Sequence, residues 1–269
     1  ALIALSLIGG IIGTTIFAVQ AEANARLAEE KAREAEEEEV RAKAVNEFMT
    51  TMLRSVDPAV AGMLDTALMK LILDEASEEL QTAERPVSVE SNLREAVGLA
   101  YLMIGSYPEA ETHLRRRLEL MKEYEPDDPS LPFVAMNHVG VLHFMQGQYE
   151  QAIPLLRSAH EGIEAIGGTY TEQLHNAKSD LSNALLSQGD VESARDILAE
   201  ARDRARSTFG DEDPMVFGVL SDLAIVEIEF GEYASSRDFM SEALDGRRRL
   251  LGDDHPLTLK SMAGLGMIH

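Results

Sequence analysis

Apolar and small residues recur at a fixed interval of 42 residues over the C-terminal part of the chain. The interval is marked by Gly105, Gly147, Gly189 and Gly231. An aliphatic residue lies eight positions before each glycine, a small residue lies five positions after it, and a large apolar residue lies nine positions after it. The three sets are Val97, Val139, Leu181 and Leu223; Ala110, Ala152, Ala194 and Ser236; and Leu114, Leu156, Leu198 and Met240.

A unit of this kind is typical of a helical hairpin. The glycine allows the turn between two helices, the small residue lets the second helix pack closely on the first, and the large apolar residues join neighbouring hairpins. Each hairpin buries its apolar face only against its neighbours. The sequence therefore predicts an all-α repeat region with units at about 88–129, 130–172, 173–214 and 215–256, and a partial unit at 257–269.

The junctions between units carry a motif of their own. The stretch FGDEDPMVF at 209–217 returns as LGDDHPLTL at 251–259. Glycine readily ends a helix and proline suits the first turn, so Gly252 should end one helix and Pro256 should begin the next. Together with the turn glycines, this pattern resembles the tetratricopeptide repeat, in the 42-residue form of kinesin light chains. The resemblance leads us to expect tyrosine two positions after the turn glycine and alanine five positions after it. Val191 and Ser236 depart from this pattern. The resemblance implies a superhelix of stacked helix pairs.

Residues 1–19 carry no charge and are predominantly apolar. At about 1.5 Å of rise per residue, a helix of this length nearly crosses a hydrocarbon layer of about 30 Å. We therefore expect a transmembrane helix here, with a secretory signal peptide cut near residues 21–23 or a buried soluble helix as the alternatives. Gly9 and Gly13 would let two such helices approach closely as a homodimer, although small residues are common in membrane spans in any case.

Residues 20–56 predict a long charged juxtamembrane helix. Glutamates precede basic residues by four positions, an arrangement that contributes about 0.2–0.5 kcal/mol per pair, at Glu22/Arg26, Glu29/Arg33, Glu37/Arg41 and Glu39/Lys43. Large apolar residues are too few for a good coiled-coil seam, which favours a stiff spacer over a dimeric signalling helix. Asp57-Pro58 ends the helix. The amphipathic stretch that follows makes 57–87 a helical capping segment.

The order of these segments carries a second resemblance. A membrane span, an Ala/Glu/Arg helix, AVNEFMTTMLRSVDP, LDEASEEL and then the repeats make the chain similar to the region after the kinase domain in bacterial membrane serine/threonine protein kinases of the planctomycete type. The resemblance implies a single-pass membrane protein with a cytoplasmic kinase domain upstream and extracytoplasmic repeats. The chain has no Gly-rich phosphate loop, H-R-D or D-F-G motif, so no catalytic residue is assigned and these residues are not expected to form an enzyme.

Charge and composition narrow the chemistry further. The net charge of −23 argues against nucleic acid as a partner and favours a partner with basic residues. Cysteine is absent, and the seven histidines form no compact ligand set, so no metal or cofactor is expected. His138 and His143 are interpreted as ordinary groove or surface residues. The basic runs in HLRRRLEL and GRRRLL are interpreted as outer-face charge on second helices.

The family resemblance also indicates where a partner would bind. In such repeats the inner face is lined by the first helix of each unit, at 13, 10, 6, 3 and 2 positions before the turn glycine. From these positions we take as the peptide-binding groove Asn92, Glu95, Met103, Asn137, Val141, Phe144, Met145, Asn176, Ser179, Asn183, Ser187, Ser221, Ile225 and Glu229. The same positions also include Leu99, Leu102, Val134, Leu186, Gly218 and Ile228. Internal packing is the alternative for the residues six and three positions before the glycine, and it is equally compatible with Leu102, Phe144, Leu186 and Ile228.

Asn137 and Asn183 are the strongest candidates, because an amide on the inner face has no evident packing role. Amides bond a peptide backbone, and Met and Phe adapt to its side chains. The sequence thus predicts an interaction or sensor region that binds a peptide or protein, within a transmembrane kinase. The alternative is a membrane-anchored or secreted repeat scaffold without a kinase.

Overall fold

The computed structural model describes residues 31, 66–82, 86–123, 126, 128–167 and 170–268. The chain divides into two units, 1–65 and 66–269. The expected membrane helix at 1–19 lies outside the described residues, as does the charged helix at 20–56 apart from Lys31, so both stay predictions. No helix within the described ranges is long and apolar enough to cross a membrane.

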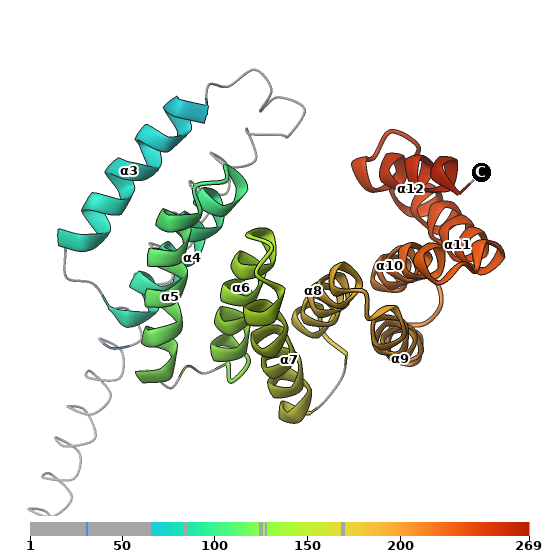
Figure 1. The fold of residues 1–269 in the computed structure, drawn as a ribbon, viewed down its shortest axis with the longest axis horizontal. Coiled ribbons are helices and arrows are strands. Elements are labelled where there is room, and N and C mark those ends of the chain that lie inside the picture. Colours follow the sequence, from blue (N-terminus) through green and yellow to red (C-terminus); the bar gives the residue numbers. More distant parts are fainter. Residues whose placement is uncertain are drawn as a thin grey trace, which may run out of the picture. The chain divides into compact units, whose positions relative to one another are not determined.

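The described part of the second unit is helical throughout and contains no strand, which confirms the all-α prediction. Its helices are α3 (Thr66–Thr82), α4 (Val87–Met103), α5 (Tyr107–Glu123), α6 (Leu131–Met145), α7 (Tyr149–Ile166), α8 (Glu172–Gln188), α9 (Val191–Phe209), α10 (Pro214–Phe230), α11 (Tyr233–Leu251) and α12 (Pro256–Met267), as labelled in Figure 1. The bounds that the sequence suggests for the individual units stay predictions.

The hairpins turn where the sequence predicts. At Gly189 and Gly231 the backbone takes φ values of 93° and 89°, which glycine adopts without the steric cost that a side chain would add. Their amides bond back to the preceding helix, from Gly189 to the carbonyl of Leu186 and from Gly231 to that of Ile228. This geometry ends the first helix of a hairpin and sends the chain directly into the second.

The repeated junction motif ends one helix and begins the next, as expected. Gly210 and Gly252 terminate α9 and α11 with φ values of 84° and 86°. The side chain that precedes each proline then caps the following helix. Asp213 accepts from the amide of Met215 at 2.8 Å, and His255 Nδ1 accepts from that of Leu257 at 3.2 Å.

Within each hairpin the two helices meet at a pair of small residues. A small residue lies seven positions before each turn glycine, and another lies five positions after it. The pairs are Gly98/Ala110, Gly140/Ala152, Ser182/Ala194 and Ala224/Ser236, and all are buried. In the last hairpin the hydroxyl of Ser236 donates to the carbonyl of Ala224 at 2.7 Å.

A leucine from the second helix fills the space over the same position. A Cβ atom on Gly98 would lie 2.8 Å from Leu114, and one on Gly140 would lie 2.7 Å from Leu156, which is closer than atoms pack. The two helices can therefore approach this closely only where the first helix lacks a large side chain.

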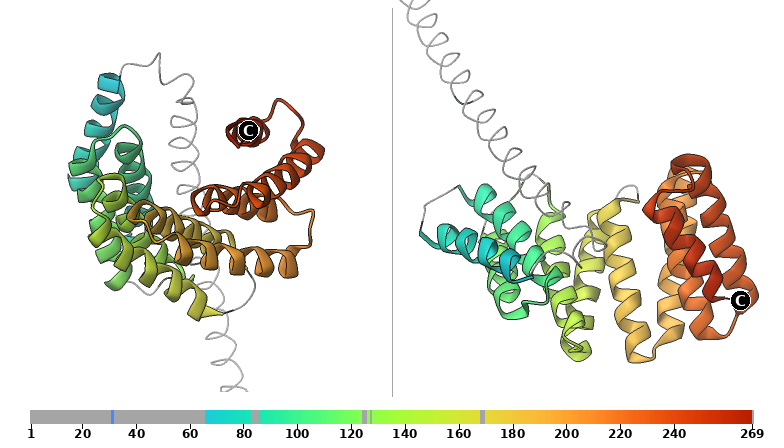
Figure 2. Two further views of the ribbon diagram at one scale, coloured as in Figure 1. Left: turned by 45° about the vertical axis from the view of Figure 1, so that its right-hand side comes forward. Right: turned by 90° about the horizontal axis from the view of Figure 1, so that it is seen from above.

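Successive hairpins lie side by side (Figures 1 and 2). The second helix of each hairpin contacts the first helix of the next, and α4, α6, α8 and α10 also contact one another in order. Among the described helices, no pair of consecutive second helices makes a comparable contact. The first helices therefore lie on the inner side of the stack, and we call the face that they form the inner face.

Leu181 tests the packing between hairpins. It is fully buried in the largest apolar cluster, which extends from α7 to α11. Leu181→Asp would bury an unpaired charge and should lower the free energy of unfolding by about 3–5 kcal/mol. Chemical denaturation followed by circular dichroism measures this. Asn183→Asp is the matched control, because it adds the same charge at an exposed position of the same helix. Equal effects of the two changes would contradict the packing described here.

Candidate partner-binding face

Two positions of each first helix remain open on the inner face. They lie six and two residues before the turn glycine, and we call their eight side chains the groove row. Its most exposed apolar members are Met103 (63%), Met145 (49%) and Ile225 (42%). Asn183, Ser187 and Glu229 are also exposed, while Leu99 and Val141 are partly buried and Val141 packs against the main core cluster.

The other expected groove positions divide between solvent and core. Asn92 and Asn176, thirteen residues before the glycine, are exposed. The residues three positions before the glycine pack inward instead. Leu102 is buried, and Phe144 contacts the main core cluster with its ring 5.9 Å from that of Tyr149. Phe144 thus has a packing role, whichever partner the face binds.

The residues ten positions before the glycine connect one repeat to the next. The Asn137 amide donates to Asp180 at 2.6 Å, and the Ser179 hydroxyl donates to Asp222 at 2.7 Å. Each partner is 43 residues further along the chain, at nine positions before its own glycine. The series stops at Ser221, whose hydroxyl donates to the carbonyl of Phe217 in its own helix. We call these bonds the inter-repeat pairs.

Asn137 therefore has a structural role, because its side chain bonds one repeat to the next. It is only 5% exposed, and its amide nitrogen is bonded to the next repeat. The prediction that Asn137 has no packing role is wrong. Its partner Asp180 lies on a helix of the next repeat, which the periodicity within one repeat does not reveal. The 43-residue spacing between polar residues was a usable signal. Asn183 is exposed, so the expectation for this residue stays a prediction.

Between the first two hairpins the same two positions are held by Glu95 and His138, and Arg117 from α5 bonds both. Arg117 is 1% exposed, and its guanidinium lies 2.9 Å from Glu95 and donates to Nδ1 of His138 at 3.0 Å. Burial, and then the charge of Arg117, lower the pKa of His138 to about 3, so its ring is neutral at pH 7. Burial raises the pKa of Glu95, and Arg117 opposes that rise.

The interpretation of both basic runs as outer-face charge is thus partly wrong. Arg117 lies inside, as does Arg247, which donates to Ser261 Oγ at 2.6 Å and to the Phe217 carbonyl at 3.2 Å. Of the two histidines expected in the groove or on the surface, His143 is buried and His138 is partly exposed, and His113 is buried as well. These side chains bond residues of neighbouring helices.

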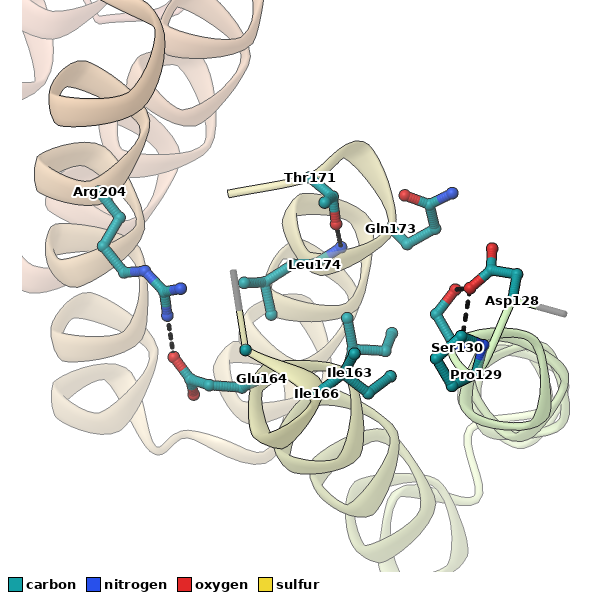
Figure 3. Close-up of a pocket in the computed structure, with 11 residues that line it drawn as sticks. Asp128, Pro129, Ser130, Ile163, Glu164, Ile166, Thr171, Gln173, Leu174 and Arg204 are labelled. Carbon is teal, nitrogen blue, oxygen red and sulfur yellow. Dashed lines mark hydrogen bonds and ion pairs between the residues drawn. The ribbon is translucent and has the colours of Figure 1, made fainter. Parts of the chain in front are cut away.

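A pocket of about 320 Å³ lies elsewhere, where α6 begins and α7 ends (Figure 3). Most of its polar groups already bind one another. Glu164 pairs with Arg204, Asp128 accepts from Ser130, and Thr171 caps α8 at the amide of Leu174. Figure 3 shows these pairs around the apolar side chains of Ile163 and Ile166. Such a pocket offers little for a ligand to bond. The described part of the chain also contains no group of three acidic or histidine side chains placed to hold a metal.

Comparison with known proteins agrees with this geometry. A family model for the tetratricopeptide repeat matches residues 88–165, 131–207, 173–248 and 215–269. A search of curated proteins gives no match.

Several solved structures share the fold. BtubC from P. vanneervenii is 18% identical, with 76% of this chain and 81% of that one covered and a TM-score of 0.61. TPR-like repeats from a Podospora anserina protein named as a kinesin light chain are 17% identical, with 69% and 87% covered and a TM-score of 0.56. Bacillus thuringiensis PlcR, solved with the peptide PapR7 and DNA, is 13% identical, with 84% and 74% covered and a TM-score of 0.60.

The inter-repeat pair of Asp180 makes stability depend on pH. Burial raises the pKa of Asp180 to about 6, against the bond from Asn137, and nearby Asp222 raises it further. The unfolded chain releases this proton at its ordinary, lower pKa. The contribution of Asp180 to the free energy of unfolding should therefore fall as pH rises from about 4 to about 6 and stay constant above that.

Asp180→Asn should remove this dependence, leaving the variant more stable than the parent at pH 8 by on the order of 2 kcal/mol, with little difference at pH 4. Denaturation curves across this range measure the effect. Asp238→Asn controls for the loss of one exposed carboxylate on a second helix. A difference between Asp180→Asn and the parent that is the same at every pH would contradict the assignment.

Proposed function

This chain belongs to the tetratricopeptide repeat family, and on that basis we propose that residues 66–269 bind a peptide or an extended segment of a partner protein along the inner face. The observation that carries the proposal is the groove row. Each first helix is buried by its own second helix and by the neighbouring hairpins, yet the residues six and two positions before the glycine stay open in every repeat or are only partly covered.

The groove row has the chemistry that an extended peptide requires. Met103 and Met145 present flexible apolar side chains that adapt to different partners. Asn183 offers an amide that can donate and accept along a peptide backbone. The PlcR structure, which contains the peptide PapR7, shows that a protein with this fold can be solved with a peptide. At 13% identity that likeness concerns the fold alone.

The charge of the chain favours a basic partner. The net charge of −23 attracts basic segments and repels nucleic acid, and the attraction should weaken as salt rises. No catalytic role is proposed for these residues. The repeat fold is an interaction module, and the described face has the features of a binding surface.

The membrane setting is a further part of the proposal. The uncharged residues 1–19 would anchor the chain by a single span, with the charged helix at 20–56 as a spacer and the repeats outside the cytoplasm. The basic residues that follow the span oppose that orientation, because positive residues usually stay inside. The resemblance in segment order supports a transmembrane serine/threonine kinase with its catalytic domain upstream, and a kinase-free scaffold is the second candidate. A Gly-rich loop, H-R-D and D-F-G encoded upstream of residue 1 would decide for the kinase.

Selection of random displayed peptides on the full chain tests the binding face. Changing both Met145 and Asn183 to Ala should weaken the selected peptides by about tenfold, which corresponds to about 1.4 kcal/mol of lost contact. Fluorescence anisotropy measures the dissociation constants. Gln151→Ala, an exposed amide on α7, is the matched control and should change them little. Undiminished binding by the double variant, with its helical content intact, would remove this face as the site.

Membrane attachment is tested with vesicles. The full chain should sediment with liposomes, because residues 1–19 would insert, whereas a chain that begins at Lys43 should stay in the supernatant. Protease access on intact cells then reports the side on which the repeats lie. A full chain that stays soluble and monomeric without detergent would contradict the proposed anchor.

A further inference from the structure

The groove row changes its chemistry halfway along the inner face. In α4 and α6 its members are Leu99, Met103, Val141 and Met145, all apolar. In α8 and α10 they are Asn183, Ser187, Ile225 and Glu229, of which only Ile225 is apolar. A partner that lies along the whole face therefore meets an apolar half first and a polar half second. We call these the apolar half and the polar half.

The helices that form this face contain few lysine or arginine residues. The four helices α4, α6, α8 and α10 carry only two lysine or arginine residues, Arg94 and Lys178. Arg94 is 8% exposed and bonds Glu90 at 2.6 Å. Lys178 is fully buried and bonds Glu200 at 3.1 Å. Both cations are thus paired inside the fold and cannot meet an acidic partner on the inner face.

Negative charge remains in the polar half. Glu229 is exposed, and it forms no ion pair with any part of the chain that the structure describes. It also lies in the last turn of α10, where the helix dipole disfavours an acidic side chain. The fold therefore gives no local reason for this carboxylate. Asp180 and Asp222 also lie on α8 and α10 and are partly exposed, but they already accept the inter-repeat bonds from Asn137 and Ser179.

We propose that the inner face recognises a two-part peptide, with apolar side chains against the apolar half and lysine or arginine side chains against the polar half. The proposal rests on the peptide-binding function proposed above and specifies the chemistry of the partner. Apolar side chains of the peptide cover Met103 and Met145 and remove apolar surface from water. Asn183 bonds the backbone where the peptide crosses to α8, and Glu229 pairs with the basic end.

The test uses synthetic peptides and the full chain in detergent, with affinity measured by fluorescence anisotropy. The first peptide joins an apolar segment to a basic segment. It is made in both chain orders, and the order that binds more tightly is used. A second joins the same apolar segment to an acidic one, and a third joins a polar segment to the basic one. We expect the apolar–basic peptide to bind best and the apolar–acidic peptide to bind at least about tenfold more weakly, a difference of about 1.4 kcal/mol.

Two substitutions test which half of the inner face binds which segment of the peptide. Glu229→Lys should weaken the apolar–basic peptide by about fivefold to tenfold at low salt and reduce its advantage over the apolar–acidic peptide. Asp238→Lys makes the same charge change on the outer helix α11 and should have less than about a twofold effect. Met145→Gln should weaken both peptides that carry the apolar segment and leave the polar–basic peptide unchanged. Both altered positions in the groove row are exposed, so the fold should be retained.

The outcomes separate the two proposals. Equal binding of the basic and acidic peptides, or equal effects of Glu229→Lys and Asp238→Lys, would overturn the two-part recognition while leaving peptide binding in place. If peptides selected from a random library also bind, but are insensitive to every change on the inner face, the proposed function itself is wrong.

Discussion

The contact on which the rest of the structure depends is the close approach of two helices at a pair of small residues. Gly98 lies directly against Leu114 of the second helix and Gly140 against Leu156, so a leucine fills the space that a side chain on the first helix would need. Because the second helix lies so close, it covers one side of the first helix. The neighbouring hairpins cover two further sides. Only a narrow strip of each first helix is left open, and these strips together make the groove row.

The inter-repeat pairs limit that strip further. The bonds from Asn137 to Asp180 and from Ser179 to Asp222 use the positions ten residues before the turn glycine, so these side chains hold neighbouring repeats together. A buried polar group is costly unless it is bonded, and the amide nitrogen of Asn137 finds its acceptor one repeat away. What remains for a partner is therefore a small set of side chains, and the chemistry of that set changes from apolar to polar along the stack.

The sequence was sufficient to predict the repeat architecture. The glycine turns and the proline junctions are local, since each depends on a few residues whose conformational preferences are strong, and the structure places them as expected. The partners of Asn137 and Arg117 were not predictable in the same way, although the 43-residue spacing from Asn137 to Asp180 was a usable signal. Each depends on how closely one hairpin approaches the next, and a pattern within one repeat does not contain that distance. The small residues seven positions before each glycine were visible in the sequence but were overlooked.

The central claim is that a partner contacts the first helices and not the second. Amide hydrogen exchange, measured by mass spectrometry with and without a peptide selected on the full chain, tests this most directly because it reports every helix at once. We predict that bound peptide slows exchange in the last turns of α4, α6, α8 and α10, which carry the groove row. Protection confined to α5, α7, α9 and α11, with the first helices unchanged, would contradict the claim.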